Sequence, residues 1–371
     1  MGVNQVIVWI MAGFMLLGAA DRCLDGRFGL GKAFDEGISA MGGLMVPMVG
    51  FIAAAPVIGS LLAPLVGPVY QALGADPAMF AGTILSSDMG GYPLARTMAL
   101  DPQAADFAGI IVGAMLGGDL CFAIPVILGF VREEDLADCS TGIMAGIITI
   151  PVGCFCGGLA AGFGAVMLLR NLFPILLLSA FLVLGLWRFP RKMVRGFLLF
   201  SRGVIILATA MFALAAFQQM TSVELLPGMA PAGEGILIVG SIGIVLAGAY
   251  PMVAVINRAF CRPLGRIGRA LGVNAAACAG IVAMFANLLP VLPMVRSMDR
   301  RGKVMAMAFG VNAGAVFGDY LGFTAGTTPH MIAPMIIAKL AGGFCAILAV
   351  RVFFREPAES AAGELSGAGP V

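Results

Sequence analysis

Long apolar stretches, each close to the length that crosses a lipid bilayer, recur along the whole chain. About 20 apolar residues span the hydrocarbon core as a helix. Such stretches lie near residues 4–20, 37–55, 107–130, 141–168, 172–187, 198–217, 235–255, 304–327 and 331–353. Only 11% of the residues are charged, whereas a soluble domain has roughly 25%. The chain is therefore predicted to be an all-α, polytopic membrane protein.

The ends of the chain carry further predictions. The first apolar stretch lacks a basic n-region and a small-residue cleavage site, so it is expected to be a retained span rather than a signal peptide. Residues 1–355 are predicted to form a single transmembrane domain. Residues 356–371, rich in Gly, Ala, Ser and Pro, are predicted to be a disordered tail.

The eight cysteines have neither metal-site spacing nor an evident pairing. They are expected to be small buried apolar residues. We predict no metal and no cofactor, and the absence of basic–aromatic surface patterns predicts no nucleic-acid partner.

The segment Gly82–Pro93 interrupts an apolar stretch with two serines, an aspartate, two glycines and a proline. A broken backbone at membrane depth is tolerated only where protein or a water-filled cavity surrounds it. An aspartate costs roughly 2.5–3.5 kcal/mol at the centre of a spanning helix. Asp88 is therefore a candidate binding residue.

The chain also contains an internal repeat. A shift of 198 positions aligns residues 36–101 with 234–299 without a gap, and a slip of two places Gly118-Asp119 on Gly318-Asp319. We predict repeat 1 at about 36–131 and repeat 2 at about 234–328. Duplications of this kind are typical of secondary transporters, which bind substrate near the midplane between discontinuous helices.

The counterpart of the first interrupted segment is Ala279–Pro293. Its polar residue, Asn287, falls within one position of the partner of Asp88. Each repeat thus has one interrupted segment, and the two are predicted to flank the binding site.

The distribution of basic residues predicts the orientation, because Lys and Arg concentrate in cytoplasmic loops. If the N-terminus is external and the C-terminus is cytoplasmic, every basic cluster lies on the cytoplasmic side of the membrane. Segment 56–74 has no charge, whereas its partner 254–272 has four arginines. The two segments are expected on opposite sides, which predicts inverted repeats.

Two arrangements of the interrupted segments remain open. Residues 77–100 and 275–298 are favoured as re-entrant hairpins, because a single crossing by 275–298 would separate the flanking basic groups. In the alternative, 56–74 and 254–272 also span the membrane, which requires four arginines to cross.

Three carboxylates lie deep in apolar segments: Asp88, Asp119 and Asp319. Each could cap a half-helix or bond a neighbouring helix. Buried carboxylates in repeat-related places also suit a cation or a proton. Tyr92 and Tyr320 closely follow two of these acids, and an aromatic face beside a carboxylate suits a small ammonium compound, although ordinary packing explains them equally well.

Two further residues are expected to lie outside the site. Lys339 lies within the last apolar segment, and it is expected to be a snorkelling or paired residue rather than a substrate ligand. His330, the single histidine, is predicted to lie at an external surface. Enzyme motifs are also missing from the sequence: the acids lack the Gly-x-Gly-Asp context of intramembrane aspartyl proteases, and no phosphate-binding Gly-Lys-Ser/Thr loop is present.

Several long motifs occur in the same order as in a known family. They are Glu36–Gly42, Leu73–Thr83, Asp88–Gly91, Gly248–Met252 and Gly318–Phe323. With them the chain resembles the ethanolamine-utilisation membrane transporters of bacteria, over nearly its whole length. Asp88 and Asp319 lie in matching motifs, whereas Asp119 does not.

The resemblance implies uptake of ethanolamine across the bacterial inner membrane. The ammonium is expected near Asp88 or Asp319, and the hydroxyl near Ser86, Ser87 or Asn287. The sequence leaves open proton coupling, facilitated diffusion and a homo-oligomeric state. The alternative function is a non-transporting membrane receptor or assembly protein.

Overall fold

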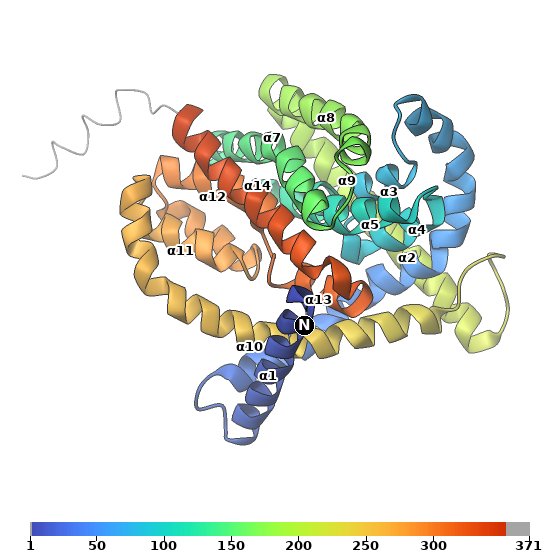
Figure 1. Cartoon of the computed structure of the whole chain (residues 1–371), viewed down its shortest axis with the longest axis horizontal. Coiled ribbons are helices and arrows are strands. Elements are labelled where there is room, and N and C mark those ends of the chain that lie inside the picture. The colour runs from blue at the N-terminus through green and yellow to red at the C-terminus, as the bar shows by residue number, and fades with distance from the viewer. Residues whose placement is uncertain (1, 354–371) are drawn as a thin grey trace, which may run out of the picture.

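The computed structural model describes residues 2–353, apart from the side chains of residues 257 and 260–270. The described part is all-helical (Figure 1). It contains eight helices that are long and apolar enough to cross a membrane. The predicted tail, 356–371, lies outside the described residues. The structure therefore confirms the prediction of a polytopic helical bundle.

The membrane-length helices match the predicted spans in order, with one exception. They are α1 (Val3–Cys23), α2 (Leu30–Ala72), the continuous helix of α5 (Pro102–Asp106), η2 (Phe107–Gly117), η3 (Asp119–Ala123) and α6 (Ile124–Phe130), α7 (Leu136–Ala160), α8 (Ala165–Arg188), α9 (Pro190–Thr221), α10 (Ala232–Leu271), and η5 (Pro329–Met331) with α14 (Ile332–Phe353).

The exception is the stretch 304–327, for which the prediction of one continuous span is wrong. It consists of α12 (Arg300–Ala313) and α13 (Asp319–Thr327), separated by irregular backbone. Ala315 has a positive φ of 53°, and its N–H donates to the Met284 carbonyl at 2.8 Å. The carbonyls of the neighbouring interrupted segment thus replace the intrahelical bonds lost at the break.

The first interrupted segment folds back on itself. Hairpin 1, residues 76–101, contains α3 (Ala78–Ile84), η1 (Ser87–Met89) and α4 (Gly91–Met98). At its base the Asp76 carboxylate accepts the backbone N–H of Leu100 at 3.0 Å and of Asp101 at 3.1 Å. The two ends of hairpin 1 therefore meet.

The second interrupted segment closes at the equivalent positions. Hairpin 2, residues 274–299, contains α11 (Ala275–Met284) and η4 (Leu289–Ser297). The Asn274 N–H donates to Asp299 Oδ1 at 2.9 Å, and its side-chain amide donates to the Ser297 carbonyl at 2.7 Å. Adding 198 converts Asp76 to position 274 and Asp101 to position 299, so the same two positions close both hairpins.

Two very long helices, α2 and α10, pack against each other along their membrane-length parts (Figure 1). At 1.5 Å per residue, the 43 residues of α2 extend to about twice the thickness of the hydrocarbon core. α2 contains four prolines, which bend helices. Both helices run without interruption through 56–72 and 254–271, the segments whose membrane placement the sequence left open.

The contacts of two glycines give the relative direction of α2 and α10. A Cβ on Gly37 would meet the backbone of Leu246 and Ala247, and a Cβ on Gly235 would meet Val49. Going forward along α2 from Gly37 to Val49 therefore means going backward along α10. The two helices are antiparallel.

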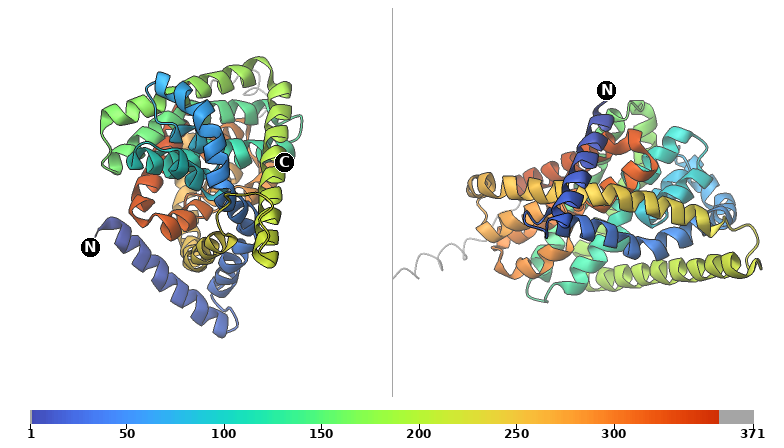
Figure 2. Two further views of the ribbon diagram at one scale, coloured as in Figure 1. Left: turned by 90° about the vertical axis from the view of Figure 1, so that its right-hand side faces the viewer. Right: turned by 90° about the horizontal axis from the view of Figure 1, so that it is seen from below.

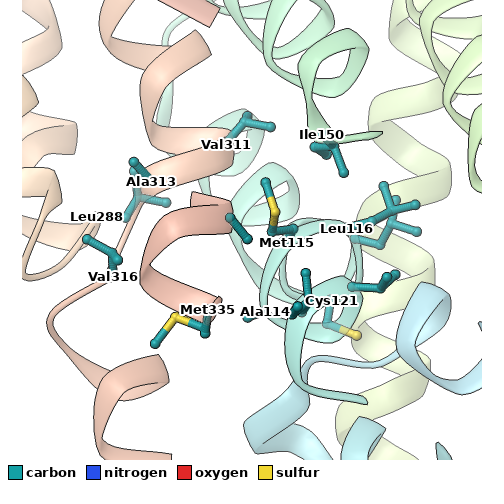
Figure 3. Close-up of a cluster of buried hydrophobic side chains, with 14 of the residues drawn as sticks. Ala114, Met115, Leu116, Cys121, Ile150, Leu288, Val311, Ala313, Val316 and Met335 are labelled. Carbon is teal, nitrogen blue, oxygen red and sulfur yellow. The ribbon is translucent and has the colours of Figure 1, made fainter. Parts of the chain in front are cut away.

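In the core, α7 packs against both α12 and α14. Small residues let these helices approach closely: a Cβ on Gly146 would meet Val311, and one on Gly153 would meet the Ala338 carbonyl. Met115 of η2 fills the same region beside Val311 and Met335 (Figure 3). α1 lies at the edge of the bundle (Figure 2), and its most apolar window is only 11% buried.

Candidate functional site

A cavity of about 760 Å³ lies where the two hairpins, α2, α9 and the break between α12 and α13 meet. Its volume is in the range typical of small-molecule sites. Six of the eight predicted site residues line it: Ser86, Asp88, Asp119, Asn287, Asp319 and Tyr320. The tertiary structure thus gathers polar residues from positions far apart in the sequence into one chamber.

Asp88 lies in η1, at the break between the two helices of hairpin 1. Its side chain is buried, and the Ser86 hydroxyl donates to its Oδ1. The same hydroxyl lies 3.4 Å from the phenol oxygen of Tyr320. Because Gly90 takes up a φ of 94°, the chain can turn directly after Asp88. The break therefore directs a carboxylate and a hydroxyl into the cavity together.

Asp319 is the first residue of α13, directly after the break in the predicted span. A helix N-terminus favours a carboxylate, because its free N–H groups carry partial positive charge. The hydroxyl of Tyr250, on α10, donates to Asp319 Oδ1 at 3.3 Å. Both side chains line the cavity.

Asp119 begins η3, a π-helical part of the continuous helix Pro102–Phe130. It is 3% exposed, and its Oδ2 has no hydrogen-bond partner among the described residues. π-Helical turns are frequent at functional sites. A buried carboxylate oxygen beside a cavity and without a partner is an acceptor for a bound cation.

Asn287 lies between the two helices of hairpin 2 and lines the cavity. Its side-chain carbonyl accepts the Leu289 N–H at 2.9 Å. The side-chain carbonyl of Asn287 therefore caps the first residue of η4. Its amide NH₂ is the group that remains available to a ligand.

Lys339 of α14 also lines the cavity, so of the two expected roles, snorkelling or paired, the snorkelling one is wrong. It is 2% exposed, and its ammonium donates to the Ala114 carbonyl at 2.6 Å. A snorkelling lysine reaches water at the membrane surface, whereas this side chain points to the interior of the bundle.

Two predicted site residues lie outside the cavity lining. The Tyr92 hydroxyl donates to Asp106 Oδ1 at 3.1 Å, and its ring packs edge-on against Phe323. The buried Ser87 packs against Gly113, and its hydroxyl has no partner among the described residues. The His330 side chain is 67% exposed, as predicted, with its Nε2 2.9 Å from Asp106 Oδ2.

A match to a family model covers nearly the whole described chain. The model for the ethanolamine utilisation protein EutH matches residues 3–353. The chain belongs to the EutH family.

Relatives of this EutH family member agree in length and sequence. The chain is 51% identical to the Listeria monocytogenes protein named "Probable ethanolamine permease EutH", with 94% of this chain and 93% of that protein covered. Identity is 42% to the Salmonella typhimurium protein of the same name, with 94% of each covered. It is 45% to Bacillus subtilis YxeR, with 97% of each covered. No solved structure matches the chain.

Five further polar residues of this EutH family member line the cavity without having been predicted as site residues: Glu36, Ser39, Thr209, Tyr250 and Lys339. In the sequence, Tyr250 stands out only within a family motif, and Lys339 is expected to be a snorkelling or paired residue rather than a substrate ligand. A lysine in mid-span is costly in lipid, so its position in the middle of an apolar segment was the available signal. Among the described residues, no group of three or more His, Cys, Asp and Glu side chains could hold a metal ion.

Proposed function

We propose that this protein is a permease that carries ethanolamine into the cell as its ammonium ion. The observation that carries the proposal is the convergence of Asp88, Asp119 and Asp319 on one cavity inside a membrane-type bundle. Two relatives with this length and sequence are named as ethanolamine permeases. An aliphatic amine is protonated at neutral pH, so the cavity suits the charge of the substrate.

The charged end of the substrate belongs beside the carboxylates. An ammonium offers three N–H donors, and Asp88 and Asp319 enter the cavity from hairpin 1 and α13. Hydrogen bonds between charged partners are roughly twice as strong as neutral ones. We place the ammonium between these two acids, with the unpartnered oxygen of Asp119 as a further acceptor.

The hydroxyl end belongs beside neutral polar groups. The Ser86 hydroxyl and the Asn287 amide line the same cavity. Ser87 is buried against Gly113, and its role as a ligand stays a prediction. A polar site that an analogue leaves unpaired costs about 1–3 kcal/mol per group. Ethanolamine should therefore bind better than ethylamine, which lacks the hydroxyl.

We further propose that the two repeats have inverted topology. The antiparallel pair α2 and α10 supports this, because adding 198 converts Gly37 to Gly235 and Val49 to position 247, so each contact has its repeat-related copy. Such reciprocal contacts are the mark of a two-fold relation. The closed bases of hairpins 1 and 2 support re-entrant segments that return to the side where they began.

Uptake of labelled ethanolamine into liposomes that contain the purified protein tests the proposed function. We expect uptake above that of empty liposomes, competed strongly by unlabelled ethanolamine and weakly by ethylamine. Folded protein that gives no uptake and no competition would contradict the proposal and favour a receptor. Equal competition by ethylamine would contradict only the role of the polar groups.

A further inference from the structure

Lys339 places a cation of the chain itself against the aromatic face of the cavity. Its Nζ lies 4.1 Å from the centroid of the Tyr320 ring, and the ammonium is held there by the Ala114 carbonyl at 2.6 Å. The lysine and tyrosine both line the cavity, and the lysine is 2% exposed. In a desolvated site, contact between a cation and an aromatic face is stabilising.

The ammonium of Lys339 attracts the cavity carboxylates without covering them. Asp88 and Asp119 line the same cavity as this ammonium. Among the described residues, no carboxylate lies within ion-pair distance of its Nζ, and Asp119 Oδ2 remains without a hydrogen-bond partner. The face of the Tyr320 ring that Lys339 covers is thus occupied, whereas a carboxylate oxygen of Asp119 is available to a ligand.

We propose that Lys339 determines specificity: by filling the aromatic cation position it restricts the cavity to ammonium ions that have N–H donors, and it excludes quaternary ammonium compounds. This inference rests on the proposed function. A quaternary ammonium has no N–H to give to a carboxylate and is recognised chiefly on aromatic faces. With the Tyr320 face occupied, such a ligand loses the contact with that ring and cannot donate a hydrogen bond to the cavity carboxylates.

The wild-type protein supplies the first measurement. Ethanolamine and its mono-, di- and trimethylated forms are added as competitors of labelled ethanolamine uptake. We expect competition to weaken along the series, with a loss of at least about tenfold when the last N–H is removed, because the last charged hydrogen bond to a carboxylate is then lost. Choline that competes as well as ethanolamine would overturn the proposal.

Substitutions of Lys339 provide the second measurement. Lys339→Ala opens the space over Tyr320, whereas Lys339→Met removes the charge but still fills that space. We expect choline to raise the thermal unfolding temperature of Lys339→Ala, with binding about tenfold tighter than to the wild type. Lys339→Met should gain nothing. Equal choline binding by both variants, or none by a folded Lys339→Ala, would overturn the proposal.

The two proposals fail in different ways. If the wild type transports no ethanolamine, the proposed function fails, and choline binding to Lys339→Ala still reports on the occupied aromatic face. If the wild type transports ethanolamine and choline alike, only the role of Lys339 fails. When Lys339→Ala does not fold, the methylated series in the wild type decides the question.

Discussion

At the residue scale, the cavity depends on single polar side chains that hydrogen bonds hold in place. The Ser86 hydroxyl donates to Asp88, and the Tyr250 hydroxyl donates to Asp319. Each acid follows a backbone break, since Asp88 lies between α3 and α4 and Asp319 begins α13. Irregular backbone thus brings two of the three cavity aspartates into the bundle, whereas Asp119 comes from π-helical turns of a continuous helix.

Asp88→Asn should lower ethanolamine uptake by about tenfold or more, because the amide keeps the shape of the side chain but removes a charged hydrogen bond worth about 1.5–3 kcal/mol. The loss should be largest at acidic external pH, where the neutral form of the substrate that crosses lipid unaided is scarce. Uptake into cells at acidic and alkaline external pH measures this.

The control for Asp88→Asn is Asp35→Asn, at an exposed acid that pairs with Arg22 on the surface. Exposed ion pairs contribute little, so this variant should transport like the wild type. If Asp88→Asn instead reduces the amount of folded protein in the membrane as much as it reduces uptake, the acid is structural.

At the element scale, α2 and α10 cross each other at closely packed glycines. Gly37 lies against the backbone of Leu246, whereas Gly42, on the same helix, has open space where a Cβ would be. Close packing of this kind leaves no room for a methyl group. Substituting alanine for each of these two glycines therefore separates the effect of close helix packing on stability from the effect of helix propensity.

Gly37→Ala should destabilise the purified protein by about 1–3 kcal/mol through overpacking. Gly42→Ala should leave stability unchanged or raise it, since Ala is favoured over Gly in helices by up to about 1 kcal/mol. Thermal unfolding in detergent measures both. Equal effects of the two substitutions would show that the crossing is looser than the structure indicates.

At the scale of the whole molecule, the question is which ends of the helices face which side of the membrane. The basic clusters predict a cytoplasmic turn after α1, with the exposed Cys23, and an external loop after α9, with Ser222. Antiparallel α2 and α10 are compatible with this orientation, because it requires these two helices to cross the membrane in opposite directions.

A cysteine-labelling experiment tests this orientation. In a background without the other cysteines, Ser222→Cys should react with a membrane-impermeant thiol reagent in intact cells, and Cys23 should react only after the membrane is permeabilised. The reverse pattern would contradict the predicted orientation. Labelling of both positions in intact cells would contradict the assignment of α1 as a span.

Hydropathy and motifs alone determined much of this protein. The spans other than 304–327, the two interrupted segments and the family follow from the sequence, because the preference of an apolar stretch for lipid is a local property of about 20 residues. Asp88, Asp119 and Asp319 were recognisable for the same reason, as charges where lipid penalises them.

Only the tertiary structure decided the break at Ala315, the position of Tyr92 outside the cavity, and the contacts of Tyr250 and Lys339. The break depends on the carbonyl of Met284, far earlier in the chain. The direction of Lys339 depends on the Ala114 carbonyl and the Tyr320 ring. The sequence shows the cost of a polar group at membrane depth, but its partner is set by how distant helices pack.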